Sequence, residues 1–244
     1  MLVRFPSLIA AGGCAIVLAA CGASTAVATG AGTSVTQASS VAGIPAFDSG
    51  APRGAQFGLV IGLPQSGSRL GKSSAPVTLT LYGDLECSLC KQLVLGHAFS
   101  KLITHDVRAG RLQIRYVAFR TATPTGSVFM EQQVATLAAG RQQRFWQYAM
   151  LFLSHQATEG THYVTASFLD DLARQVPGLN FARWQAARQT RTLAAQVRSG
   201  ERSANRHGID GTPTLIFHGR RGSKTVQTPF PDYRQLEHAI NAVS

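Results

Sequence analysis

Cys87 and Cys90, two cysteines separated by two residues, are the side chains best suited to chemistry in this sequence. The alternating apolar run over 77–82 predicts a buried strand that leads into them, and a helical pattern follows. At such a junction the first sulfur stands at the start of a helix, where unpaired amide N–H groups and the helix dipole favour thiolate over thiol. The pair therefore indicates thiol–disulfide exchange, with Cys87 as the attacking sulfur and Cys90, one turn further on, as the buried resolving thiol.

The N-terminal segment bears on how many thiols the mature chain keeps. Residues 1–4 carry one positive charge, and residues 5–20 are almost wholly apolar but short for a membrane span, which needs ~20 residues. The stretch Leu18-Ala19-Ala20-Cys21-Gly22 resembles the lipobox of bacterial lipoproteins. The resemblance implies a signal peptide over 1–20, cleavage before Cys21 and a lipid thioether on its sulfur. The alternatives are an ordinary secretory signal or an uncleaved anchor, with Cys21 incidental.

The cysteine count then leaves one close pair. Of the four cysteines, Cys14 would be removed with the signal peptide and Cys21 would be blocked by lipid. The close spacing of Cys87 and Cys90 in an exported protein indicates a redox-active pair rather than a structural disulfide. Zinc is disfavoured because a structural site requires four ligands and the chain has no second Cys pair. We therefore expect no metal and no other cofactor.

Composition predicts a packed core and a basic surface. The chain of 244 residues is 45% hydrophobic and 14% charged, with a formal net charge of +11. Its Arg residues are scattered without a nucleic-acid motif, so we expect no nucleic-acid partner. The basic balance instead favours solubility and attraction to an anionic membrane or envelope surface. Residues 21–56, rich in Ala, Gly, Ser and Thr without periodicity, predict a disordered tether.

The elements around the pair follow from hydrophobic periodicity. A strand at 77–82, a helix that continues to Ile103 and a strand at 112–119 predict a βαβ unit with parallel strands. Residues 127–206 have helical patterns throughout, and Asn180 has the residue type of a helix N-cap. This region is expected to be a helical insertion in the domain.

Strand patterns return after the helical region. Residues 214–218 and 225–228, joined by a Gly-rich turn, predict an antiparallel hairpin, and a last helix is expected over 233–243. A further short strand is expected at 58–62. The predicted organisation is one α/β domain made of residues 57–126 and 207–244, interrupted by a helical insertion over 127–206.

This layout resembles a known family at four places. They are Leu70-Gly71 with Ala75-Pro76-Val77, the stretch Asp84-Leu85-Glu86-Cys87-Ser88-Leu89-Cys90, Gly140 with Phe145-Trp146 and Leu151-Phe152, and Gly208-Ile209-Asp210-Gly211-Thr212-Pro213-Thr214. Together they are similar to the DsbA-like family of exported thiol:disulfide oxidoreductases, nearest the branch of Gram-positive and actinobacterial envelopes. The resemblance implies a thioredoxin-like α/β fold with an inserted helical subdomain.

The resemblance also assigns the second half of the site. It implies that Pro213 is a cis-proline opposite the cysteines and that Thr212 faces the sulfurs. The backbone of this loop would pair with an extended substrate as an added strand does. A Gly-Thr-Pro-Thr run just before a buried strand independently suits a cis bond.

The sequence departs from the family around the sulfurs. Ser88 and Leu89 would tune the pair, and Leu89 offers no charge to stabilise a thiolate, which favours a milder oxidant. Leu81 stands where family members commonly carry a buried acid that accepts the second thiol's proton. We expect Asp84, rather than Glu86, to serve as a proton relay, the alternative being a solvated turn carboxylate.

The leading hypothesis is an envelope enzyme that donates its Cys87–Cys90 disulfide to folding exported proteins through a mixed disulfide at Cys87. Its expected partners are reduced or unfolded exported proteins, a quinone-coupled membrane thiol oxidase that restores the disulfide, and the membrane itself through lipidated Cys21. We expect a monomer. The alternatives are an envelope reductase or isomerase, and a non-catalytic lipoprotein whose thioredoxin-like domain binds client proteins.

Overall fold

The computed structural model describes residues 55–226 and 228–244. The predicted signal peptide, the lipidation at Cys21 and nearly all of the predicted tether lie outside the described residues. Within the described part of the chain, no helix is long and apolar enough to cross a membrane.

A six-stranded sheet, in the order β1-β2-β4-β3-β5-β6, holds the fold together. The strands are β1 (Gln65–Ser66), β2 (Arg69–Leu70), β3 (Val77–Gly83), β4 (Leu112–Ala118), β5 (Thr214–Gly219) and β6 (Gly222–Val226). The pair β3–β4 is parallel, and all other neighbours are antiparallel. The predicted parallel βαβ unit and the predicted hairpin are therefore both confirmed.

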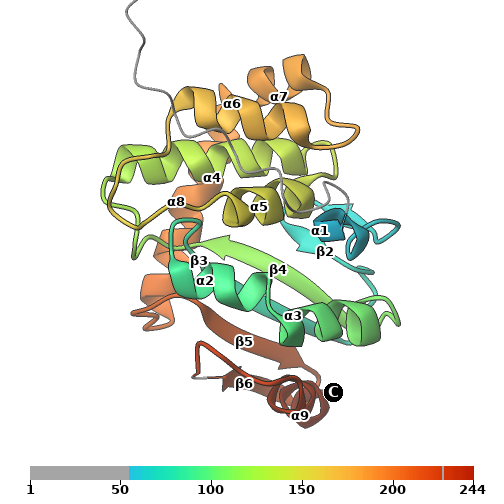
Figure 1. Cartoon of the computed structure of the whole chain (residues 1–244). Coiled ribbons are helices and arrows are strands. Elements are labelled where there is room, and N and C mark those ends of the chain that lie inside the picture. Colours follow the sequence, from blue (N-terminus) through green and yellow to red (C-terminus); the bar gives the residue numbers. More distant parts are fainter. Residues whose placement is uncertain (1–54, 227) are drawn as a thin grey trace, which may run out of the picture. The chain divides into compact units, whose positions relative to one another are not determined.

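Helices flank this sheet and make up all the regular secondary structure between β4 and β5 (Figure 1). They are α1 (Ala55–Gly58), α2 (Ser88–Val94), α3 (His97–Lys101), the π-helical segment η1 (Leu102–Val107), α4 (Gly126–Gly140), α5 (Phe145–Ser154), α6 (Ala166–Gln175), α7 (Phe181–Arg188), α8 (Arg191–Arg206) and α9 (Tyr233–Val243). The Asn180 side chain accepts a hydrogen bond from Arg183 N and caps α7, as predicted. The observed class is the expected α/β fold with a helical insertion.

Two predicted elements differ from the structure. The strand expected at 58–62 is wrong, because the chain there forms the end of α1 and then a turn in which Gly62 has φ +75°. The helix expected to continue from Cys90 to Ile103 is interrupted at Gly96, the N-cap of α3. A Cβ at Gly96 would lie 2.5 Å from Gln92 O, so the tight break between α2 and α3 requires glycine.

The two faces of the sheet are covered by different parts of the chain. Leu79 and Leu81 on one face belong to the main core, whereas Tyr82 belongs to a smaller cluster with Val117, Ile216 and Ala204. Because successive side chains of a strand point to opposite faces, β3 contributes to both. Ala204 lies on α8, so this last helix of the insertion covers the second face at the end where β3 leads into the cysteines.

The helical insertion shares its core with the sheet. The ring of Phe145 in α5 lies 5.4 Å from the ring of Tyr116 in β4, and Trp146 lies 6.0 Å from Phe99 in α3. All four side chains are buried in one cluster. Residues 126–206 therefore pack onto the α/β part of the fold.

Candidate active site

The cysteine pair occupies the junction between β3 and α2. Cys87 is the N-cap of α2, with φ −69° and ψ 120°, and Cys90 lies in the first turn of that helix. Both are free thiols, and their side chains are 5% and 4% exposed. The structure thus places the first sulfur at a helix start, as the sequence predicts.

The loop that contains Thr212 and Pro213, called the proline loop below, lies directly against Cys87 Sγ. The Thr212–Pro213 peptide bond is cis, as the resemblance implies. Cys87 Sγ donates to Thr212 O at 3.3 Å. This loop leads into β5, whose register pairs Thr214 with Tyr82, so strand pairing carries Thr212 and Pro213 to the cysteines across more than a hundred residues of sequence.

The surroundings of Cys87 favour its thiolate. Its pKa is lowered from 9.0 to about 6, chiefly by the hydrogen bond from the Cys90 thiol. Burial opposes this shift, while hydrogen bonds from Thr212 and from the N–H groups of Cys90 and Leu89 add to it. Above about pH 6, Cys87 is therefore ionised and nucleophilic.

The pKa of Cys90 is shifted in the opposite direction. Burial first, and then its hydrogen bond to Cys87 and the charge there, raise the pKa of Cys90 well above 9.0. A buried thiol with a raised pKa stays protonated while its partner ionises. The geometry distinguishes an attacking sulfur from a resolving sulfur, which is the division that exchange chemistry uses.

Asp84 is fully buried, so the alternative that it is a solvated turn carboxylate is wrong. Its carboxylate accepts five hydrogen bonds: from the N–H groups of residues 121, 122 and 123, from Glu86 N and from Thr123 Oγ1. With its oxygens so occupied, Asp84 has no free lone pair aimed at a thiol. This geometry argues against Asp84 as the proton relay.

Residues 121–123, whose N–H groups donate to Asp84, also contact the proline loop. Thr121 Oγ1 and Thr212 Oγ1 lie 2.5 Å apart. Gln132 Nε2 donates to Thr123 Oγ1 at 2.6 Å and ties the segment to α4. Three segments distant in sequence are thus linked around the sulfurs. Sequence reasoning missed Thr121 and Thr123, since no local pattern distinguishes them from other loop threonines.

Glu86 is buried without compensation. Its side chain is 0% exposed, and neither carboxylate oxygen has a hydrogen-bond partner among the described residues. Burial, followed by the charge of Asp84, raises the pKa of Glu86 to about 7. Glu86 therefore exchanges its proton near neutral pH, although the structure gives it no contact with either sulfur.

Leu81 is buried in β3, between Tyr116 of β4 and Leu215 of β5. The position where the resemblance led us to look for an acid is therefore apolar, and Tyr116 is paired beside it. Tyr116 OH donates to Gly83 O at 2.7 Å and accepts from Gln133 Nε2 at 3.2 Å. Burial, followed by the charge of Cys90, raises the pKa of Tyr116, so this hydroxyl remains protonated.

The two residues between the sulfurs face outward. Ser88 is exposed and Leu89 is half-buried. The Ser88 amide donates to Glu159 Oε1 at 2.6 Å, a contact from the loop between α5 and α6. Glu159 is another residue that sequence reasoning missed, because it lies in a loop 71 positions from its partner.

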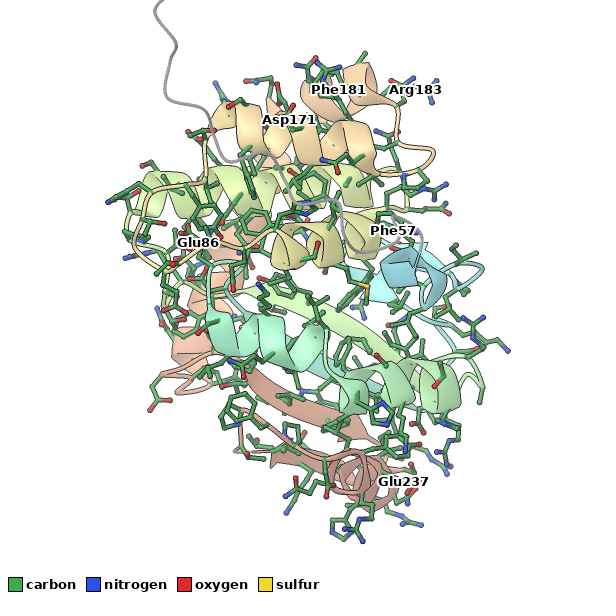
Figure 2. All side chains as sticks on the ribbon, in the orientation of Figure 1. Phe57, Glu86, Asp171, Phe181, Arg183 and Glu237 are labelled. Atoms are coloured by element: carbon green, nitrogen blue, oxygen red, sulfur yellow. The ribbon has the colours of Figure 1, made fainter. Side chains whose placement is uncertain are left out.

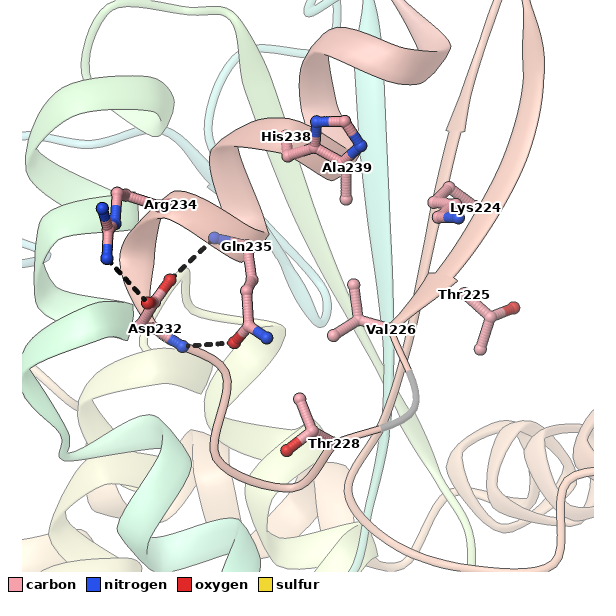
Figure 3. Close-up of a pocket in the computed structure, with 9 residues that line it drawn as sticks. All are labelled: Lys224, Thr225, Val226, Thr228, Asp232, Arg234, Gln235, His238 and Ala239. Atoms are coloured by element: carbon pink, nitrogen blue, oxygen red, sulfur yellow. Dashed lines mark hydrogen bonds and ion pairs between the residues drawn. The ribbon is translucent and has the colours of Figure 1, made fainter.

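A cavity of about 520 Å³ lies elsewhere, between β6 and α9 (Figure 3). Its lining is Lys224, Thr225, Val226, Thr228, Asp232, Arg234, Gln235, His238 and Ala239. Asp232 and Gln235 in this lining form the capping box that starts α9. None of these residues belongs to the site around the cysteines, so the cavity is separate from the thiol chemistry.

Comparison with known families and proteins agrees with this geometry. The family described as Thioredoxin matches residues 65–241. Disulfide bond formation protein D of Bacillus subtilis is 24% identical over 179 residues, which cover 70% of this chain and 74% of that protein. Na(+)/H(+) antiporter NhaA 1 of Salinispora arenicola is 30% identical over 159 residues, covering 64% of this chain but only 22% of that relative.

Solved structures show the same fold. The oxidised BdbD structure from Bacillus subtilis has a TM-score of 0.62 at 22% identity, covering 73% of this chain and 95% of that one. DsbA from Chlamydia trachomatis has a TM-score of 0.59 at 19% identity, covering 71% of this chain and 89% of the other. At these identities the similarity establishes the arrangement of the elements.

Proposed function

The chain belongs to the thioredoxin family and, within it, to the DsbA-like thiol:disulfide oxidoreductases, and on this premise we propose that it donates a Cys87–Cys90 disulfide to reduced exported proteins. The observation that carries the proposal is the asymmetry of the two sulfurs beside the cis Thr212–Pro213 loop. Cys87 has a pKa lowered to about 6, whereas the pKa of Cys90 is raised. A stabilised Cys87 thiolate favours the reduced enzyme and so makes its disulfide an oxidant.

The reaction runs through a mixed disulfide. A substrate thiolate attacks Cys87 Sγ of the oxidised enzyme, the bond between Cys87 and Cys90 breaks, and Cys90 leaves with the electron pair and takes up a proton. A second substrate thiolate then attacks the substrate sulfur of the mixed disulfide and releases Cys87 as a thiolate. The substrate loses two electrons and the enzyme gains them. The raised pKa of Cys90 favours its protonation after the first step.

The proline loop supplies the substrate-binding side. Thr212 O lies 3.3 Å from Cys87 Sγ, close enough for a substrate backbone on this loop to bring its sulfur to Cys87. An extended segment of substrate would bind here through main-chain hydrogen bonds, with little demand on its sequence. That mode suits an enzyme acting on many unfolded proteins. Thr212 and Pro213 are the proposed substrate-binding residues.

The cellular setting belongs to the same proposal. The likeness to a disulfide bond formation protein supports an activity outside the cytoplasm, because protein disulfides persist mainly in oxidising compartments. We infer that the chain is tethered through lipidated Cys21, acts as a monomer and is returned to its disulfide form by a quinone-coupled membrane thiol oxidase. Stable anchoring requires more than one acyl chain, which a bacterial lipoprotein carries.

A trapping experiment tests the proposal. In Cys90→Ala, the Cys87 thiolate attacks a disulfide of an exported protein, which forms a mixed disulfide and releases one protein thiolate. Because no Cys90 remains to reverse this step, exported proteins are expected to accumulate as adducts of the variant. Cys87→Ala serves as the control and is expected to trap none. The purified wild-type protein, once oxidised, should also introduce a disulfide into a reduced model protein.

The competing functions predict different results. A reductase would trap clients but would fail to oxidise the reduced model protein and would have a reduction potential near that of thioredoxin, about −270 mV. A non-catalytic binding lipoprotein would leave a disulfide-formation defect fully complemented by Cys87→Ala. Either result would overturn the oxidase assignment.

A further inference from the structure

The loop between α5 and α6, residues 155–165, is bonded to the turn that carries the first cysteine. Gln156 Nε2 donates to Leu85 O at 2.8 Å and to Cys87 O at 3.1 Å. In return, Lys91 Nζ donates to Gln156 O at 3.4 Å. The proposed exchange reaction uses none of these contacts, so the attachment of this loop calls for its own explanation.

Glu159 brings a carboxylate to the residue that follows the nucleophile. Its Oε1 accepts from Ser88 N at 2.6 Å, and both side chains are exposed to solvent. A hydrogen bond to an ionised acceptor is short and comparatively strong, which is consistent with this distance. The insertion therefore holds a carboxylate at the backbone amide of Ser88, the residue that follows Cys87.

The other ionisable groups around Cys87 are buried, protonated or bonded to backbone. Asp84 is buried and accepts five hydrogen bonds, and Glu86 is buried with a pKa of about 7. Cys90 and Tyr116 remain protonated, and Lys91 is bonded to the loop backbone. Unlike the carboxylates of Asp84 and Glu86, the carboxylate of Glu159 is exposed to solvent.

We propose that Glu159 is a positioning residue of the site, whose carboxylate disfavours the Cys87 thiolate and makes the Cys87–Cys90 disulfide a milder oxidant. The inference rests on the proposed exchange at Cys87 and deepens it. Charge repulsion raises the free energy of the reduced, ionised enzyme but leaves the oxidised enzyme unaffected. The equilibrium with any thiol substrate therefore moves toward the oxidised enzyme.

Glu159→Gln separates the charge from the hydrogen bond. The Gln side chain keeps an oxygen that accepts from Ser88 N, while the negative charge is lost. For unit charges taken to be ~6 Å apart in a water-like dielectric, Coulomb's law gives a pKa change of about 0.5 unit. The pKa of Cys87, followed by thiolate ultraviolet absorbance in the reduced protein, is expected to fall by about that amount. The equilibrium with glutathione at neutral pH should shift about threefold toward the reduced enzyme.

Asp171→Asn provides the matched control. Asp171 is exposed on α6, so its replacement removes the same charge from the insertion without touching the loop. Figure 2 shows Asp171 well away from Glu86, which lies at the end of the molecule where α2 begins. No change in the pKa of Cys87 is expected in this variant, and an equal change in both variants would overturn the proposal.

Two further measurements make the inference specific. Raising the ionic strength should shrink the difference between wild type and Glu159→Gln, because exposed charges are screened. In a Glu86→Gln background the effect of Glu159→Gln should persist. Its disappearance there would show that Glu159 acts only through the ionisation of Glu86 and would refute the direct effect. An unchanged or raised pKa of Cys87 in Glu159→Gln would refute it outright.

The failure of this inference is distinguishable from failure of the proposed function. The titration of Cys87 requires no substrate and reports the charge effect alone. Oxidation of a reduced model protein by wild type reports the function alone. A protein that oxidises substrates but shows no shift in Glu159→Gln keeps its function and loses this role for Glu159.

Discussion

At the scale of single residues, the reactivity of Cys87 is set by groups from separate parts of the chain. Cys90 and the amides of α2 lower its pKa to about 6, together with Thr212 of the proline loop. Asp84 acts by a different route, since its five hydrogen bonds fix the segment that contacts Thr212. The acid nearest the pair in sequence, Glu86, is buried and uncompensated.

Glu86 gives a prediction about stability against pH. Its folded-state pKa of about 7 lies above the ordinary value of 4.5, so folding favours the protonated form. This contribution to stability is fully present below about pH 4.5 and is lost as the pH rises through about 7. Glu86→Gln, which stays neutral, should therefore gain stability relative to wild type across this range, up to roughly 3 kcal/mol at pH 8.

Urea unfolding of both proteins at several pH values checks the sign. Glu131→Gln, an exposed position on α4, serves as the control and should show no pH-dependent difference from wild type. A Glu86→Gln variant that is less stable than wild type at pH 8 would contradict the assignment of Glu86 as an uncompensated buried acid.

At the scale of elements, glycines mark where helices meet other backbone closely. The break at Gly96 ends α2 after seven residues and redirects the chain into α3. Gly200 lies in the middle of α8, where a Cβ would stand 2.7 Å from Ala118 O at the end of β4. The absence of a side chain at Gly200 therefore lets α8 lie against β4, the strand next to β3, which leads into the cysteines.

Gly200→Ala tests this role of Gly200, because helix propensity and steric overlap change the free energy of unfolding in opposite directions. Helix propensity alone predicts that alanine stabilises α8 by about 1 kcal/mol. Overlap with Ala118 O predicts a net loss of about 1–3 kcal/mol in the free energy of unfolding. Chemical denaturation should show destabilisation. Ser199→Ala, at the exposed neighbouring position, should change stability by less than about 0.5 kcal/mol.

At the scale of the whole molecule, the insertion and the α/β part form one core. Buried side chains of β3, β4, α3 and α5 belong to a single cluster that also includes Trp184 of α7. The insertion cannot expose its helices without exposing the faces of α3 and β4 that it covers. Its α5–α6 loop is also bonded to the cysteine turn.

This arrangement predicts cooperative unfolding. The two tryptophans, Trp146 and Trp184, both lie in the insertion and are buried, so their fluorescence reports on the packing of the insertion. Far-ultraviolet circular dichroism reports on the whole fold. The two urea transitions should coincide in midpoint and slope. Loss of tryptophan burial ahead of the far-ultraviolet signal would instead show that the insertion unfolds as an independent unit.

The sequence by itself determined the features that depend on neighbouring residues. The parallel strands on either side of the cysteines, the helical segment after β4 and the cap at Asn180 could all be predicted, because periodicity and capping are local properties. The break at Gly96 and the turn at 58–62 could not be predicted. Gly96 depends on a close approach to Gln92 O, and Gly62 adopts φ +75°, and the hydrophobic pattern shows neither.

Only the tertiary structure decided what the charged residues near the sulfurs do. Asp84 and Glu86 stand two positions apart in the same turn, yet five donors from folded segments satisfy one and none satisfies the other among the described residues. Glu159 reaches Ser88 from 71 positions away. Solvation and hydrogen bonding of a charge depend on which distant segments surround it, and that information is absent from the local sequence pattern.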